Sequence, residues 1–87
     1  KDLLAGEELS VYPNPSNGVY QIKYTFEGKK ELKVSVSDVL GRAIYMKELQ
    51  ANSNFNENID MSTIAKGVYI LKIVADQHQI TRKIYIE

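Results

Sequence analysis

Apolar side chains recur at every second position along much of this sequence, and this period of two constrains the fold more than any other feature. In residues 20–26, Tyr, Ile, Tyr and Phe alternate with Gln, Lys and Thr, and residues 32–37 repeat the pattern with Leu, Val and Val. Successive side chains of a β-strand point to opposite faces, so each run predicts a strand with one buried face. The runs at residues 43–49 and 55–59 predict two further strands.

Turn-forming residues stand between these runs. Residues 27–30, Glu-Gly-Lys-Lys, are a polar connection whose glycine can take a positive φ, which predicts a hairpin between the first two runs. A second hairpin is predicted at residues 38–42, where Asp38 can accept backbone N–H groups and Gly41 can close the turn in the left-handed conformation. Residues 50–54, Gln-Ala-Asn-Ser-Asn, have the composition of a loop.

The rest of the sequence predicts a crossover and two more strands. Residues 60–67 allow barely one helical turn, with Asp60 or Ser62 as its N-cap. Residues 68–75 are apolar on both faces apart from one Lys, which favours a central strand. Residues 79–86 alternate again except at one Arg, which an edge strand tolerates.

With a first strand at residues 9–12, the sequence predicts an all-β fold, a seven-stranded antiparallel immunoglobulin-like β-sandwich. Turn signals recur roughly every 8 to 12 residues, which is typical of two packed antiparallel sheets. Residues 1–8 lack the alternation and are predicted as a linker that leads into a domain over residues 9–87. Because the sequence opens with Lys1 and not with Met, we expect it to be part of a longer protein.

The charge balance and the missing cysteines argue against several classes of function. Among 87 residues, 11 Lys and Arg balance 11 Asp and Glu, whereas binding to nucleic acid or to an anionic membrane needs a clustered excess of cations. The sequence has no cysteine, which excludes disulfides, thiolate metal sites and Cys nucleophiles. No apolar run reaches 18 residues, so we expect no direct membrane insertion.

Few residues could carry catalysis. The one histidine, His78, is predicted at a hairpin tip, where water would surround it and no neighbour would fix its tautomer. Glu57, Asp60 and Asp38 are predicted at a strand end or in a turn, as solvated carboxylates and not as a catalytic pair. The Asn and Asp side chains that alternate along residues 52–60 are expected on a wet face and do not form a calcium-binding loop. We therefore expect no enzyme, no metal site and no cofactor.

Six tyrosines leave an alternative open, a non-catalytic carbohydrate-binding or adhesion module. The aromatic residues of the run at 20–26 share a face with Ile22, which marks that face as core. Tyr45, Tyr69 and Tyr85 are expected in the core or at a rim, where the ring packs and the hydroxyl reaches water. If they instead formed an exposed platform, they could stack on sugar rings.

Three motifs that follow one another along the chain resemble a known family. In order they are Tyr12-Pro13-Asn14-Pro15 followed by Gly18, then Asp38 with Gly41-Arg42, then Gly67-Val68-Tyr69-Ile70-Leu71-Lys72, with Lys83-Ile84 near the end. In this order and spacing they resemble the C-terminal sorting domain of type IX secretion cargo, the Por secretion tail family, over residues 9–87. Each motif also serves folding, since prolines end a strand and glycines close turns.

The resemblance implies a sorting signal and not an enzyme. It implies a domain that directs its parent protein, a cargo upstream in cis, through the periplasm and across the outer membrane to the cell surface or the medium. The implied partners are the type IX translocon and a sortase-like protease that removes the domain during surface attachment. By the same resemblance the cut would fall within or before residues 1–8.

We hypothesise that the last strand is the segment that a partner protein recognises. Thr81, Lys83 and Tyr85 are expected on its solvent-exposed face, and a terminal strand offers a partner an edge to extend. Deletion of residues 80–87 should abolish export of a fused reporter, whereas Lys83→Ala should weaken export without unfolding the domain.

Overall fold

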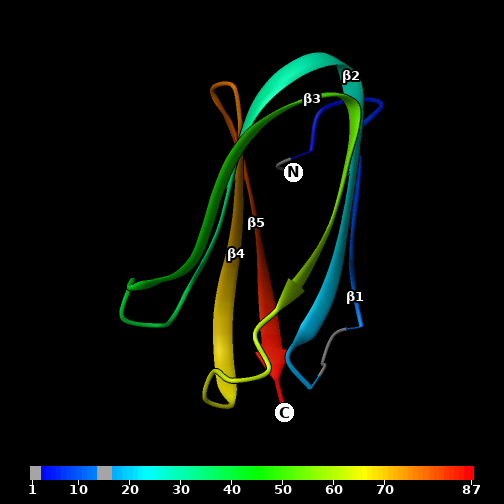
Figure 1. Ribbon diagram of the computed structural model, residues 1–87. Helices are drawn as coiled ribbons and strands as arrows, with labels where there is room; N and C mark the ends of the chain where they lie inside the picture. Colours follow the sequence, from blue (N-terminus) through cyan, green and yellow to red (C-terminus); the bar gives the residue numbers. More distant parts are fainter. Residues whose placement is uncertain (1–2, 14–16) are drawn as a thin grey trace.

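Five antiparallel β-strands make up the fold of the computed structural model, which describes residues 3–13 and 17–87 (Figure 1). In chain order they are β1 (Glu8–Tyr12), β2 (Val19–Ser37), β3 (Ala43–Asp60), β4 (Gly67–Ala75) and β5 (His78–Ile86). β2 pairs with β1, β3 and β4, and β4 pairs with β5, so the strands form one sheet. The predicted all-β antiparallel class is confirmed. The described residues contain no helix, and hence none that could span a membrane.

Two long strands, β2 and β3, give the sheet its curled shape. They pair with each other along almost their whole length, while β1 pairs with residues 21–25 of β2 and β4 pairs with residues 32–37. In Figure 1 the β2–β3 pair arches over the top of the molecule, and its two halves descend on different sides. The curled sheet therefore wraps around one hydrophobic core.

The predicted hairpin at residues 27–30 is wrong, and so is the predicted loop at residues 50–54. β2 and β3 continue through these segments and only bend there. Four of the seven predicted strands are thus the halves of two long strands, which is why the described residues form five strands and not seven. The predicted hairpin at residues 38–42 is confirmed, because β2 ends at Ser37 and pairs there with the start of β3.

The bend comes from extra residues in one strand of the β2–β3 pair. After Thr25 pairs with Asn54, the next pair is Lys29 with Asn52, so β2 carries two more residues than β3 across the bend. Gly28 takes a φ of 76° in this bulge, with open space where a Cβ would lie. Because the insertion is even, the apolar side chains of β2 stay on the same face before and after the bend.

The core lies on the inner face of the curled sheet. The aromatic face of residues 20–26 is buried, as predicted. The buried hydrophobic side chains that the strands contribute are Tyr20, Ile22, Tyr24, Phe26, Leu32, Val34 and Val36 from β2, Phe55 and Ile59 from β3, Tyr69, Leu71, Ile73 and Ala75 from β4, and Ile80, Ile84 and Ile86 from β5. The Tyr20 hydroxyl donates to the backbone carbonyl of Tyr85 and accepts from its N–H, which ties the start of β2 to the end of β5.

The positions predicted for the last two strands are confirmed. β4 lies between β2 and β5, and β5 pairs with β4 alone among the described strands, so it forms an edge of the sheet. Arg82, which interrupts the apolar face of β5, is half-buried, whereas Ile80 and Ile84 beside it are fully buried.

The connections before β1 and after β3 are tied to the strands. Asp60 Oδ1 accepts hydrogen bonds from the backbone N–H of Ser62 at 2.9 Å and from its hydroxyl at 2.6 Å. The crossover forms turns and no helix, so the predicted helical turn with its N-cap is wrong, and Asp60 instead holds a turn. Leu3 packs against the core, and the Glu7 side chain is 3% exposed. The described part of residues 1–8 is thus held against the sheet, and the division into linker and domain stays a prediction.

Candidate recognition surface

The turn between β2 and β3 is held in shape by the Asp38 side chain. Asp38 Oδ1 accepts hydrogen bonds from the backbone N–H groups of Leu40 and Arg42, both at 2.9 Å, and Oδ2 accepts one from Nε of Arg42 at 2.8 Å. Backbone bonds from Asp38 N to Arg42 O and from Gly41 N to Asp38 O close the turn, and Gly41 has a φ of 87°. The turn roles predicted for Asp38 and Gly41 are confirmed.

These hydrogen bonds favour the ionised form of Asp38. The backbone N–H of Arg42, with smaller contributions from the Arg42 guanidinium and the N–H of Leu40, lowers the pKa of the Asp38 carboxyl below its ordinary value of 3.8. The carboxylate is therefore charged at neutral pH and keeps all three of its donors.

The turn displays two aliphatic side chains that the sequence interpretation did not single out. Val39 is 72% exposed and Leu40 is 77% exposed, and these are the two most exposed large hydrophobic residues in the described part of the chain. The signal in the sequence is an apolar pair at the centre of a turn that begins with Asp and closes with Gly. Polar residues are the ordinary choice at such positions.

Two of the three sequence motifs meet at this turn. A surface depression of about 330 Å³ is lined by the turn and by the start of β4, namely by Asp38, Val39, Leu40, Arg42, Lys66, Gly67, Val68 and Tyr69. The Tyr69 ring is buried, and its hydroxyl donates to the backbone carbonyl of Ala65. Motif residues that are about 25 positions apart in the sequence therefore form one surface, because β4 pairs with the end of β2.

The outer face of β5 continues this surface. Thr81, Lys83 and Tyr85 are all exposed there, as predicted. Tyr85, at 42% exposure, is the direct cross-strand partner of Val68, which lines the depression. We call Val39, Leu40, Val68 and Tyr85 the apolar patch.

Of the first motif, Gly18 lies at the start of the crossover, next to Met61 and Ser62. Pro13 is exposed after β1, while Asn14 and Pro15 lie outside the described residues. Gly18 is buried against the crossover, where a Cβ would stand 2.7 Å from Ser62 Cα, and its carbonyl accepts from Met61 N at 2.6 Å. This glycine therefore permits a close backbone approach at the entry to β2.

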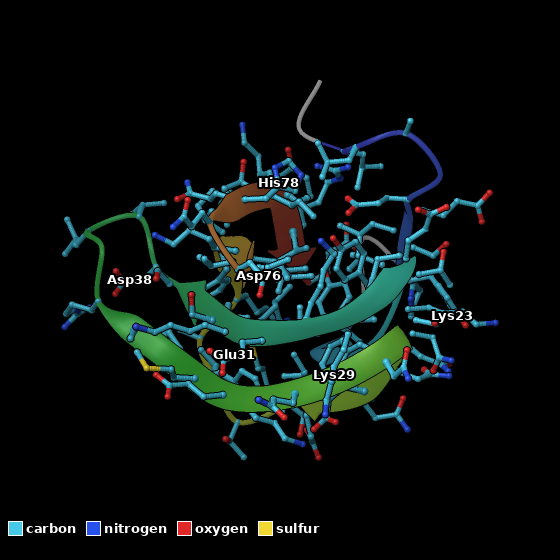
Figure 2. All side chains as sticks on the ribbon, turned by 90° about the horizontal axis from the view of Figure 1, so that it is seen from above. Lys23, Lys29, Glu31, Asp38, Asp76 and His78 are labelled. Atoms are coloured by element: carbon cyan, nitrogen blue, oxygen red, sulfur yellow. The ribbon has the colours of Figure 1, made fainter. Side chains whose placement is uncertain are left out.

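The prediction that water surrounds His78 is wrong. Its side chain is 23% exposed, and Nε2 lies 3.7 Å from Oε1 of Glu7, a nearly buried carboxylate. In Figure 2 His78 lies beside the first described residues, and Asp38 lies at another edge of the molecule. The sequence could not reveal this neighbour, because residues 3–7 show no pattern that would place them over the β4–β5 turn.

Tyr24 adds a buried hydroxyl to the same cluster. This hydroxyl has no hydrogen-bond partner of ordinary geometry among the described residues. Burial, with further contributions from the carboxylates of Glu7 and Asp76, raises the pKa of Tyr24 well above its ordinary value of 10.

The remaining candidate residues are dispersed. The Asn side chains of residues 52–58 and Asp60 are exposed, as predicted, and the described residues contain no group of three or more His, Asp or Glu side chains placed to hold a metal ion. Glu57 accepts from Lys47 Nζ at 2.9 Å and from the Tyr45 hydroxyl at 3.3 Å. Tyr69 is buried and Tyr45 is half-buried, so the two do not join Tyr85 in an exposed aromatic platform.

Comparison with known proteins confirms the family that the sequence resembles. The family model described as the secretion system C-terminal sorting domain matches residues 10–87, which is nearly the whole chain. No curated protein matches the chain. The chain therefore belongs to the family of type IX secretion C-terminal sorting domains, whose members direct the proteins that carry them to export.

Proposed function

We propose that this domain is a sorting signal. The type IX translocon recognises it and carries the cargo protein, which lies upstream in cis, across the outer membrane. The observation that supports the proposal best is the family match over residues 10–87. The meeting of Asp38, Arg42, Gly67 and Tyr69 around one depression adds to it, since a partner could contact both motifs at once.

A second part of the proposal concerns what happens after translocation. A sortase-like protease removes the domain during surface attachment, and the cargo, having passed through the periplasm, stays on the cell surface or enters the medium. Leu3 packs against the core and the Glu7 side chain is buried, so a protease would need to pull residues 3–7 away from the sheet. We therefore place the cut before Leu3. The domain itself has no catalytic role and no cofactor in this proposal.

Export of a reporter protein tests the proposed sorting function. Residues 1–87 are fused behind a periplasmic reporter that carries an N-terminal signal peptide, and the fusion is produced in a bacterium with a type IX system. The reporter should accumulate on the surface or in the medium and should remain in the periplasm of a strain that lacks the translocon. If the fused domain folds but the reporter stays in the periplasm of both strains, the proposal is wrong.

The exposed face of β5 remains our proposal for part of the recognised surface. Deletion of residues 80–87 is a poor test, because it removes the fully buried Ile80 and Ile84 from the core. Lys83→Ala changes an exposed side chain, so export should fall several-fold at unchanged thermal stability. Lys23→Ala, at an exposed position of β2, is the matched control and should export normally. Equal export of the two variants would exclude a role for Lys83.

We also propose that the curled sheet is an immunoglobulin-like sandwich in which the bends of β2 and β3 create the two layers. Support comes from the pairing, since β1 joins residues 21–25 of β2 while β4 joins residues 32–37. An experimentally determined structure in which these two halves of β2 do not face one another across the core would contradict this arrangement.

A further inference from the structure

The Val39–Leu40 pair has no role in the fold that explains its composition. The turn is closed by Asp38 and Gly41 through backbone groups and the Asp38 carboxylate, and none of these bonds involves the side chains at 39 and 40. Both side chains are more than 70% exposed. Folding would therefore accept polar residues at these positions, which are the common choice in such turns.

The turn presents this pair in one fixed geometry. Three hydrogen bonds to the Asp38 carboxylate and two backbone bonds fix residues 38–42 before any partner arrives. A preorganised segment loses little conformational entropy when it binds, so more of the contact energy is left for affinity.

The pair belongs to a larger surface. Val68 lines the same depression as Val39 and Leu40, and Tyr85 is the cross-strand neighbour of Val68. The apolar patch thus joins two motifs of the family to the face of β5. Contiguous exposed apolar side chains of this kind mark interaction sites more often than they mark ordinary surface.

The charges around the patch indicate the chemistry of its partner. Arg42 and Lys66 line the depression, and Lys83, the cross-strand partner of Ile70, lies two pairs further along the sheet from Val68 and Tyr85. Arg42 is paired with Asp38, since its Nε lies 2.8 Å from Asp38 Oδ2, so the charges of these two residues offset each other. Lys66 is exposed at the depression. The charged residues that line the depression therefore leave the positive charge of Lys66 unbalanced, and a complementary surface would be apolar at its centre and acidic at its rim.

We propose that the Val39–Leu40 turn inserts into an apolar socket with an acidic rim on a protein component of the secretion machinery. This inference rests on the proposed sorting function and specifies the contact by which the sorting signal is read. The two aliphatic side chains fill the socket, while Lys66 faces the acidic rim.

The test uses the reporter fusion in the strain with a type IX system. The double variant Val39→Ser/Leu40→Ser should lower export at least tenfold while the thermal midpoint of the isolated chain stays unchanged. Met46→Ser is the matched control, because Met46 is 55% exposed on β3 and lies outside the patch, and it should export like the wild type. Lys66→Glu, which reverses a charge at the proposed rim, should lower export and leave stability unchanged.

Each other outcome has a definite meaning. If the double variant is exported normally while the wild-type fusion depends on the translocon, the socket is wrong and the sorting function stands. If the wild-type fusion is not exported, the sorting function itself fails. If the double variant unfolds, the inference is also wrong, because it requires both side chains to be dispensable for the fold. If the isolated chain forms dimers that the double variant abolishes while export is unaffected, the patch serves self-association instead.

Discussion

Tyr20 and Tyr24 show how two identical side chains on one strand face can differ in energy. Both are buried to 1% exposure or less and both point into the core from β2. The Tyr20 hydroxyl bonds to the backbone of Tyr85, whereas the Tyr24 hydroxyl has no partner of ordinary geometry among the described residues and faces the Glu7 carboxylate. A buried polar group without a partner costs free energy that a buried bonded group does not.

Removal of each hydroxyl should therefore have a different effect on stability. Tyr20→Phe should lower the free energy of unfolding by about 1 to 2 kcal/mol, because it leaves the N–H and C=O of Tyr85 without their partner. Tyr24→Phe should change it by less than about 0.5 kcal/mol or raise it, since only an unsatisfied hydroxyl is lost. Urea unfolding of the two variants measures both values, and equal losses would contradict the assignment of the hydrogen bonds.

The ionisation of Asp38 determines how the stability of the turn in the recognition surface changes at acidic pH. Its pKa is lowered in the folded state, so the hydrogen bonds stabilise the turn fully above the ordinary pKa of 3.8, and this stabilisation is lost as the pH falls through the lowered pKa. In NMR titrations the amide signals of Leu40 and Arg42 should move together, with a midpoint below 3.8. A midpoint at or above 3.8 would show that the carboxylate is not held by these donors.

Among the elements, the sequence correctly predicted the alternation and the turn at residues 38–42. It wrongly predicted that strands end at residues 27–30 and 50–54, where β2 and β3 continue. Residues 27–30 contain Gly28 and charged side chains, which are the signals of a hairpin, yet the chain does not reverse there. Phe26 and Leu32 are both even-numbered and both buried, which fits one continuous strand but does not by itself exclude a hairpin. Local turn chemistry describes a bulge and a hairpin alike, and only the pairing with β3 distinguishes them.

The candidate surface was predictable in its parts and not in its assembly. The Asp38–Gly41 turn and the exposed side chains of Thr81 and Lys83 followed from local rules. The depression between the turn and Gly67 did not, because the register of β4 against β2 depends on contacts between residues far apart in the sequence. The burial of His78 against Glu7 was missed for the same reason.

Gly18, which belongs to the first motif, contributes to the stability of the fold in a way that Gly28 does not, and replacing each glycine by alanine tests this. Gly18 and Gly28 both have positive φ, but a Cβ at Gly18 would overlap the backbone of Ser62, while a Cβ at Gly28 would meet nothing within 4 Å. Gly28→Ala should lower the free energy of unfolding by about 1 kcal/mol through the left-handed conformation alone. Gly18→Ala should cost at least about 2 kcal/mol more, because the crossover must also move.

Thermal or urea unfolding of the two glycine variants decides the point. If Gly18→Ala and Gly28→Ala lose the same free energy, the close approach to Ser62 carries no energetic weight. Hydrogen exchange provides a second test. The Met61 N–H donates to the Gly18 carbonyl, so this amide should exchange faster with solvent in Gly18→Ala and not in Gly28→Ala.

At the scale of the whole molecule, the long strands couple both ends of the recognition surface to one core. β2 pairs with β1 near its start and with β4 near its end, and β3 spans the same length beside it. The patch at the β2–β3 turn therefore depends on the same strands that bury Tyr20 and Tyr24 near the other end of β2. Neither half of the sheet has a core of its own, because the buried side chains form one cluster.

The domain should accordingly unfold as one unit. Hydrogen exchange should give the protected backbone amides on both sides of the β2 bend, at residues 20–25 and 32–36, opening free energies that agree within about 0.5 kcal/mol, and these should equal the global free energy of unfolding from urea. Val34→Ala, a core change beyond the bend, should then lower the protection of residues 20–25 as much as that of its own segment. Protection that falls only around residue 34 would mean that the bend separates two independent parts, and the recognition surface could then open without unfolding the rest.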